Sequence, residues 1–234
     1  MSRSKAYDDF MVGIDRARRL ITLEIAIARD PPPQSKRAMV EGLRGGALVL
    51  MVAAFEHYLD SLMQEQIAML QAHPGLLFAK LPEEVRVQNV FQSLRTALDG
   101  ERYKKAPSKV DRIPAIMIAC NDVASEILKP ESFSSTGADS AAVIRHFERL
   151  SCKNVLKTIG ERFASKWKTA VHAQFIPETL DSIVGKRHLV AHTHKALQVS
   201  RIDIRGAVRF LGILALCLDI HVRRHIRVVA SKAK

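Results

Sequence analysis

The distribution of apolar residues is what most limits the folds open to this chain. Between residues 48 and 63, apolar side chains recur at intervals of three and four, the spacing that places them on one face of an α-helix. The residues of this stripe are Leu48, Met51, Val52, Phe55, Leu59, Leu62 and Met63. No segment alternates apolar and polar residues between turn signals, as a half-buried strand would. The sequence therefore predicts an all-α protein.

Three further helices have ends that the sequence marks. The first is predicted over residues 7–29 and ends before Pro31-Pro32-Pro33, because proline cannot continue a helix. A second covers residues 178–195, and a long last helix covers residues 201–227. Shorter helices are expected at 83–99, 113–128 and 139–150. We expect residues 1–234 to form a single all-α domain, a helical bundle with additional helices.

The charge of the chain is strongly positive and unevenly placed. It has 36 Lys and Arg residues against 24 Asp and Glu, a net charge of +12. Between Lys186 and Lys234 there are eleven basic residues and two acidic ones, so nine of the twelve excess positive charges lie there, beside five of the nine histidines. A basic surface attracts polyanions, nucleic acid first and anionic membranes next. The alternative is that these charges form only a solvated face, which aids solubility.

Cysteine usage and the chain's first residues indicate a cytoplasmic protein. Cys120, Cys152 and Cys217 have no paired spacing and lie among apolar neighbours, so we expect reduced, buried thiols. The opening Met-Ser-Arg-Ser-Lys lacks the apolar core of a signal peptide. The apolar runs 45–55 and 210–218 fall well short of the roughly 20 residues that span a bilayer. No membrane partner is expected.

Motifs for bound cofactors are missing from the sequence. It contains no GxxxxGK[ST] phosphate loop, no GxGxxG, no CxxC pair and no GxSxG elbow. His188 and His192 have the spacing of a zinc pair, and His194 is near, but Leu189 stands where a HExxH protease has glutamate. We therefore expect no cofactor and no metal site.

Arg187 and His192 are the residues most informative about chemistry. Arg187 follows Leu180 by seven residues, so on a helix it shares an apolar stripe, where a charge is costly unless it is paired or lines a cleft. Histidine transfers protons near neutral pH, and arginine offers a planar fork to phosphate oxygens. The two groups suit cleavage of RNA without a metal, in which a 2′-OH must lose its proton and negative charge on the pentacoordinate phosphorus group must be stabilised.

The spacing of the two residues sets a geometric condition. At about 100° per residue, positions 187 and 192 point roughly 140° apart on an ideal helix. They converge only at a wide cleft, most easily one between two copies of the helix. Structural roles are the alternatives: Arg187 closing a salt bridge with Glu56, His192 as a satisfied core histidine, and His188 as an ordinary surface residue.

The segment Arg187-His188-Leu189-Val190-Ala191-His192 resembles the R-polar-x-x-x-H motif of the HEPN superfamily. The apolar residues before it, an earlier segment Ala-Ala-Phe-Glu-His-Tyr-Leu at 53–59, and the long last helix are similar to the RiboL-PSP type of HEPN protein. The resemblance covers most of the chain in helix order, although the motif is six residues long. It implies an all-α bundle that forms a homodimer.

The resemblance also implies a function. It suggests a metal-independent endoribonuclease acting on RNA, often a toxin or a phage-defence effector, with an antitoxin or a sensor protein as partner. Arg187 and His192 would form the catalytic pair, and His188 would occupy the supporting polar position. Where some family toxins carry a tyrosine that is nucleotidylated, this chain has His194, so that control is not expected. The alternative function is a non-catalytic HEPN-like module that binds RNA or a protein.

Overall fold

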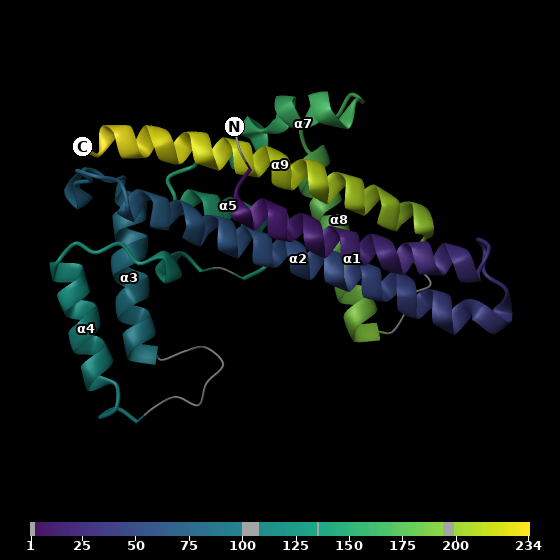
Figure 1. Cartoon of the computed structure of the whole chain (residues 1–234), viewed down its shortest axis with the longest axis horizontal. Helices are drawn as coiled ribbons and strands as arrows, with labels where there is room; N and C mark the ends of the chain where they lie inside the picture. The colour runs from purple at the N-terminus through teal and green to yellow at the C-terminus, as the bar shows by residue number, and fades with distance from the viewer. Residues whose placement is uncertain (1–2, 100–107, 135, 194–198) are drawn as a thin grey trace. The chain divides into compact units, whose positions relative to one another are not determined.

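The structure is a computed structural model that describes residues 3–99, 108–134, 136–193 and 199–234 (Figure 1). Over these residues it contains α-helices, short 3-10 turns and loops, and no strand, which confirms the all-α prediction. The helices are α1 (Lys5–Ile27), α2 (Arg37–Gln71), α3 (Glu83–Asp99), α4 (Ile113–Ala124), α5 (Ser140–Glu148), α6 (Val155–Thr158), α7 (Gly160–Trp167), α8 (Phe175–Thr193) and α9 (Arg201–Lys232).

The ends of α1 differ from the predicted 7–29 for local reasons. The helix begins at Lys5 because the Ser4 hydroxyl accepts a hydrogen bond of 3.0 Å from the backbone N–H of Tyr7 and caps the first turn. It ends at Ile27, and Ala28 is already extended with φ −147°. The carbonyl of Ala28 then accepts a hydrogen bond of 3.0 Å from Arg201, which satisfies a group that the helix leaves unpaired.

The helices predicted over 178–195 and 201–227 are both longer at one end. α8 begins at Phe175, with Pro177 in the first turn, where a missing N–H costs nothing. Its predicted end at 195 lies outside the described residues. α9 begins at the predicted residue 201 and continues to Lys232, because buried Ile226, Val229 and Ala230 extend its apolar stripe.

The chain divides into two compact units. The first contains Met1–Leu62, Thr136–Ile144 and Asn154–His221, and the second contains Met63–Ser135, Arg145–Lys153 and Val222–Lys234. The sequence-based expectation of a single domain over 1–234 stays a prediction. All three residues proposed for catalysis belong to the first unit.

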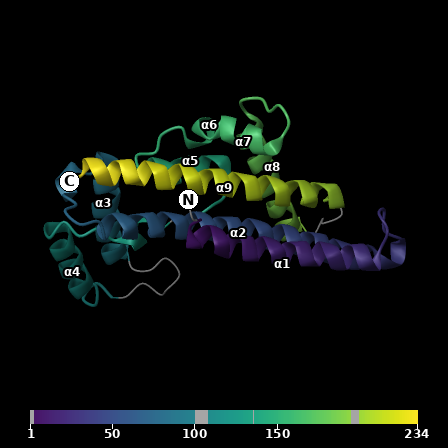
Figure 2. The ribbon, with the colours of Figure 1, turned by 45° about the horizontal axis from the view of Figure 1, so that its top comes forward.

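Aromatic side chains form the centre of the first unit. α1 lies along α2 in both ribbon views (Figures 1 and 2). Phe10 on α1 packs on Tyr58 of α2 with ring centroids 5.3 Å apart, and the Tyr58 hydroxyl donates to the Ala215 carbonyl of α9 at 2.7 Å. At Gly13 a Cβ would lie 2.6 Å from the Cβ of Ala54. The glycine therefore permits the close approach of α1 and α2.

A buried ion-pair network joins α1, α2 and α9 in the same unit. Glu24 is fully buried, and its carboxylate accepts from Arg44 Nη2 at 2.7 Å and from Arg201 Nε at 2.8 Å. Arg44 also contacts Asp30 at 2.9 Å. Burial by itself would raise the pKa of Glu24, but the hydrogen bonds and charges of the two arginines outweigh it and lower that pKa. Glu24 is therefore ionised and paired in the core.

In the second unit, α3 and α4 lie side by side (Figures 1 and 2). The buried side chain of Asn89 on α3 holds the loop that follows α4, donating to the Ile127 carbonyl at 2.8 Å and accepting from the backbone N–H of Lys129 at 2.8 Å.

The three cysteines differ in burial. Cys120 on α4 is exposed, so its expected burial was wrong. Cys152 and Cys217 are buried as expected, and burial raises the pKa of each thiol to about 11.

α2 is more apolar over a longer stretch than residues 45–55 suggested. A window of 18 residues within Gln34–Gln71 has a mean hydropathy of 1.6. By length and composition alone, this helix could cross a membrane. Of that window, 44% is buried inside the structure, and core helices of soluble proteins meet the same criterion. The expectation of no membrane partner stays a prediction.

Candidate active site

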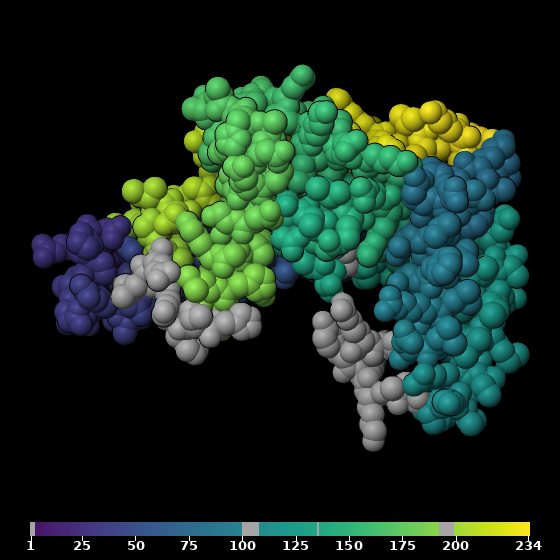
Figure 3. Space-filling model, turned by 180° about the vertical axis from the view of Figure 1, so that it is seen from behind, coloured from purple at the N-terminus to yellow at the C-terminus, as the bar shows by residue number. Residues whose placement is uncertain are grey.

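α8 carries the predicted site and presents two faces. Its inner face buries Ile176, Leu180, Ile183 and Val184. Its outer face exposes Ser182, Gly185 and His188. Figure 3 shows α8, in light green, at the molecular surface. One side of this helix is therefore held in the core while the other is open to a ligand or a partner.

The start of α8 is fixed by aromatic packing. Phe175 lies against Trp167 and Phe163 of α7 and against Phe210 of α9, with ring centroids between 5.6 and 6.2 Å. Aromatic pairs at such separations add stability beyond the area they bury. The helix is thus held at its first residue against two other elements of the first unit.

Two polar contacts fix α8 further along. Asp181 accepts hydrogen bonds from the backbone N–H and the hydroxyl of Ser140 at 2.7 and 2.8 Å, which ties α8 to the start of α5. Lys186 forms an ion pair of 2.5 Å with Asp203 in the first turn of α9. Burial would raise the pKa of Asp203, but the hydrogen bonds from Lys186 and Ser200 outweigh it and lower the pKa to about 2.

Arg187 has a buried donor that nothing in the described part of the chain satisfies. The residue is half-buried, and its Nε atom is buried without a hydrogen-bond partner. An unsatisfied buried donor costs about 1–3 kcal/mol, and more on a charged group. The described residues record no ion pair between Arg187 and Glu56, so the salt bridge weighed as an alternative is not formed. Among the described residues this Nε therefore has no acceptor.

The histidines of the motif are only partly described. His188 is exposed, one residue after Arg187 on the outer part of α8. His192 lies within α8, but its side chain is outside the described part, and so is the whole of His194. α8 is continuous as far as Thr193, so its backbone keeps the helical spacing between residues 187 and 192. The catalytic assignment of Arg187, His188 and His192 stays a prediction.

Among the described residues, no group of three His, Cys, Asp or Glu side chains is placed to hold a metal ion. The expectation that the site uses no metal rests on the chemistry of arginine and histidine and stays a prediction.

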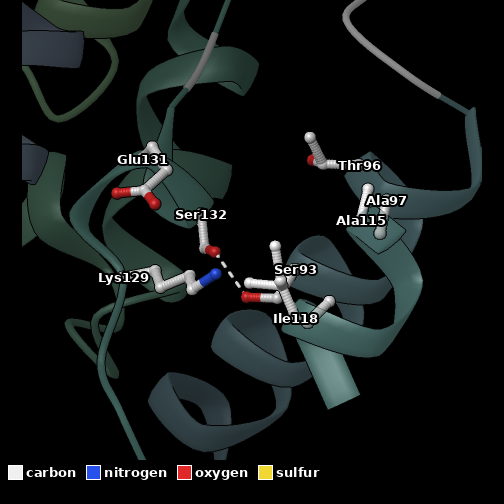
Figure 4. A pocket seen from close by; sticks show the side chains of 9 residues that line it. Ser93, Thr96, Ala97, Ala115, Ile118, Lys129, Glu131 and Ser132 are labelled. Carbon is white, nitrogen blue, oxygen red and sulfur yellow. Dashed lines mark hydrogen bonds between the residues drawn. The ribbon is translucent and has the colours of Figure 1, made fainter. Parts of the chain in front are cut away.

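A separate pocket of about 260 Å³ lies in the second unit between α3, α4 and the turn Pro130–Phe133 (Figure 4). Some of its polar groups are engaged: the hydroxyls of Ser93 and Ser132 are 2.9 Å apart, and Lys129 is paired with Asp122. None of the predicted site residues lines it. The pocket therefore offers no support for the chemistry expected of the motif.

Sequence reasoning missed the contacts that hold α8. Asp181, Asp203 and the aromatic group around Phe175 come from segments far apart in the chain, so no local spacing marks them. One partial signal exists, because Ser200 and Asp203 have the spacing of a helix cap, and they exchange backbone and side-chain hydrogen bonds of 2.9 and 3.1 Å.

Comparison with known proteins gives one result. The family profile described as RiboL-PSP-HEPN matches residues 14–224, most of the chain and all of α8. No curated protein and no solved structure matches the chain. The profile agrees with the bundle and with the similarity seen in the sequence, without singling out the motif. HEPN proteins are commonly ribonucleases, and this chain belongs to the RiboL-PSP-HEPN family.

Proposed function

We propose that this protein is a metal-independent endoribonuclease that cleaves RNA by attack of the substrate's own 2′-OH. The observation that carries the proposal is the buried, unsatisfied Nε of Arg187 on the helix that bears the motif. A phosphate oxygen is the acceptor that fits this donor best, because the guanidinium fork matches phosphate geometry and stays charged at all working pH values. Membership of a family rich in ribonucleases supports the same conclusion.

The proposed reaction needs two groups. His192 in its neutral form takes the proton of the 2′-OH, and the resulting oxygen attacks the adjacent phosphorus. Arg187 donates hydrogen bonds to the non-bridging oxygens as negative charge builds on them. The P–O5′ bond breaks and the leaving oxygen takes up a proton from an imidazolium. The products are a 2′,3′-cyclic phosphate and a 5′-OH, and His188 supports the arrangement of the pair.

A homodimer is part of the proposal because one helix cannot bring the pair together. Residues 187 and 192 lie roughly 140° apart around an ideal helix. The outer face of α8 suits the approach of a second helix, since Ser182 and Gly185 are small and exposed. A Cβ at Gly185 would meet no atom within 4 Å in the isolated chain. We propose that two copies of α8 face each other across the RNA.

We expect Gly185→Glu to abolish both dimer formation and RNA cleavage without unfolding the protein. The side chain enters open space in one chain, and glutamate favours a helix by about 0.5 kcal/mol or more over glycine. Across a two-fold interface the two carboxylates would clash and repel. Light scattering at the assay concentration, circular dichroism and cleavage of labelled RNA measure the three properties.

Gly42→Glu is the matched control for this variant. Gly42 lies on α2 in the same unit, and a Cβ there also meets nothing within 4 Å. The control should remain dimeric and active. A Gly185→Glu protein that is monomeric and still cleaves RNA at the wild-type rate would overturn the dimer proposal.

The biological setting we propose is a cytoplasmic toxin or phage-defence effector that is held in check by an antitoxin or a sensor protein. This role rests on the family and on the basic charge of the chain. Its test is growth arrest on expression of the wild-type protein, compared with an Arg187→Ala variant.

A further inference from the structure

A row of cations without acidic partners lies along α7 and the first half of α9. We call it the basic row: Arg162, Lys166 and Lys168 from α7 and its end, and Arg205 and Arg209 from α9. All but Arg162, which is half-buried, are exposed. Within the residues that the structure describes, none of the five has a carboxylate within 4.0 Å.

Two observations place α7, which carries part of the basic row, beside α9. The guanidinium of Arg209 lies 4.2 Å from the centroid of the Trp167 ring and donates to the Trp167 carbonyl. Arg162 near the start of α7 and Lys166 near its end both lie close enough to Cys217 on α9 to lower its pKa against the larger effect of burial, which raises it. α7 therefore runs along α9, as both ribbon views show (Figures 1 and 2).

Trp167, at the centre of the row, is packed among aromatic rings. Trp167 packs on Phe163 at 5.7 Å, on Phe175 at 5.6 Å and on Phe210 at 6.3 Å. Arg209 stacks on Trp167 and donates to its carbonyl, contacts that restrict its guanidinium before a ligand arrives. An ordered cation loses less conformational entropy on binding than a free side chain. Arginine planes stacked in this way are also surfaces on which bases stack.

Uncompensated positive charge on a fixed surface favours a polyanion with regularly spaced charges. We propose that the basic row binds the phosphate backbone of single-stranded RNA and leads it to the motif on α8. This inference rests on the proposed function, because it places the substrate of that same site. Phe175 belongs to the aromatic group under the row and begins α8. Arg187 lies twelve residues further, about 18 Å along the helix axis.

The separation has a consequence for substrate length. A strand that contacts both the row and Arg187 must span several nucleotides, whereas a dinucleotide reaches only one of them. Removing charges from the basic row should therefore weaken the binding of long substrates and leave the binding of the shortest substrates unchanged.

The test measures binding in a protein that does not cleave. In a His192→Ala background, the affinity for a labelled single-stranded RNA of about 20 nucleotides is followed by fluorescence anisotropy across a series of salt concentrations. We expect Lys166→Ala/Arg205→Ala to raise the Kd about tenfold near 0.15 M salt and to reduce the slope of log K against log salt by about 1.4, because two phosphate contacts are lost. Both side chains are exposed, so the fold should be unaffected.

Arg16→Ala/Arg19→Ala is the matched control. It removes the same number of charges from exposed positions on α1 in the same unit, and should change neither the slope nor the Kd by as much. Equal effects of the two double variants would overturn the proposal, since net charge alone would explain them. The proposal would also be overturned if Lys166→Ala/Arg205→Ala lost binding to phosphatidylserine vesicles and kept its RNA affinity, because the row would then bind a membrane.

Failure of the row proposal can be distinguished from failure of the proposed function. If the wild-type protein cleaves no RNA but the row variant shows the reduced salt slope, the row binds RNA and the catalytic proposal fails. If RNA is cleaved and the row variant cuts a long substrate and a dinucleotide as the wild type does, the row proposal fails alone.

Discussion

Arg187→Ala is expected to reduce RNA cleavage at least about 100-fold, because the loss of one charged donor to the developing phosphate charge typically has an effect of this size. The same substitution should leave the thermal stability unchanged or slightly higher. The Nε of Arg187 is buried without a partner among the described residues, so its removal relieves an unsatisfied donor. Cleavage of a labelled RNA and a thermal melt of the same preparation measure the two effects.

Arg187→Lys is the companion variant. Lysine keeps the positive charge but lacks the planar fork, so its activity should lie between those of the wild type and Arg187→Ala. A non-catalytic binding module would lose affinity at most, and a structural salt bridge would lose stability when the arginine is removed. Unchanged cleavage by Arg187→Ala would contradict the enzymatic proposal.

Glu24→Ala should lower the free energy of unfolding by about 3–5 kcal/mol, the usual cost of removing one member of a buried ion pair. The substitution leaves the buried Arg44 with only Asp30 and deprives Arg201 of its carboxylate. Urea unfolding followed by circular dichroism measures the change. Asp15→Ala is the control, because Asp15 pairs with Arg18 at a site where both side chains are more than half exposed, and it should change stability by less than about 1 kcal/mol.

Two carboxylates, one in this network and one at the start of α9, predict how stability depends on pH. The pKa values of Glu24 and Asp203 are lower in the folded protein than their ordinary values of 4.5 and 3.8. Carboxylates with lowered pKa stabilise the fold fully above those ordinary values and less as they become protonated. For Asp203 this contribution is lost between about pH 4 and pH 2. Glu24→Ala should therefore reduce the loss of stability on acidification.

Helices were predictable from this sequence because their signals are local. The spacing of apolar residues around Phe55 and Leu180 placed α2 and α8. The helix expected at 139–150 is α5, and Asp139 caps it by accepting from the backbone N–H of Ala142 at 2.7 Å. The prediction that Cys120 is buried was wrong because α4 exposes most of its apolar side chains. Periodicity shows that a helix has an apolar face but not whether anything covers it.

Much of the candidate site depended on contacts that no spacing reveals. The absence of a pair between Arg187 and Glu56 could be decided only once both helices were placed. Glu24 meets Arg201 across 177 positions of the chain, and Trp167 meets Arg209 across 42. Such contacts follow from tertiary packing. The motif itself was visible because its residues lie on one helix and are therefore close in sequence.

The most direct test of the central claim is an analysis of the RNA ends produced in excess EDTA. Proton transfer by His192 and charge stabilisation by Arg187 need no divalent ion, and the attacking group is the RNA's own 2′-OH. We predict unimpaired cleavage that leaves 2′,3′-cyclic phosphate and 5′-OH ends, while single-stranded DNA of the same sequence, which lacks the 2′-OH, stays intact. Activity lost in EDTA and restored by one divalent ion, or equal cutting of the DNA, would contradict this account.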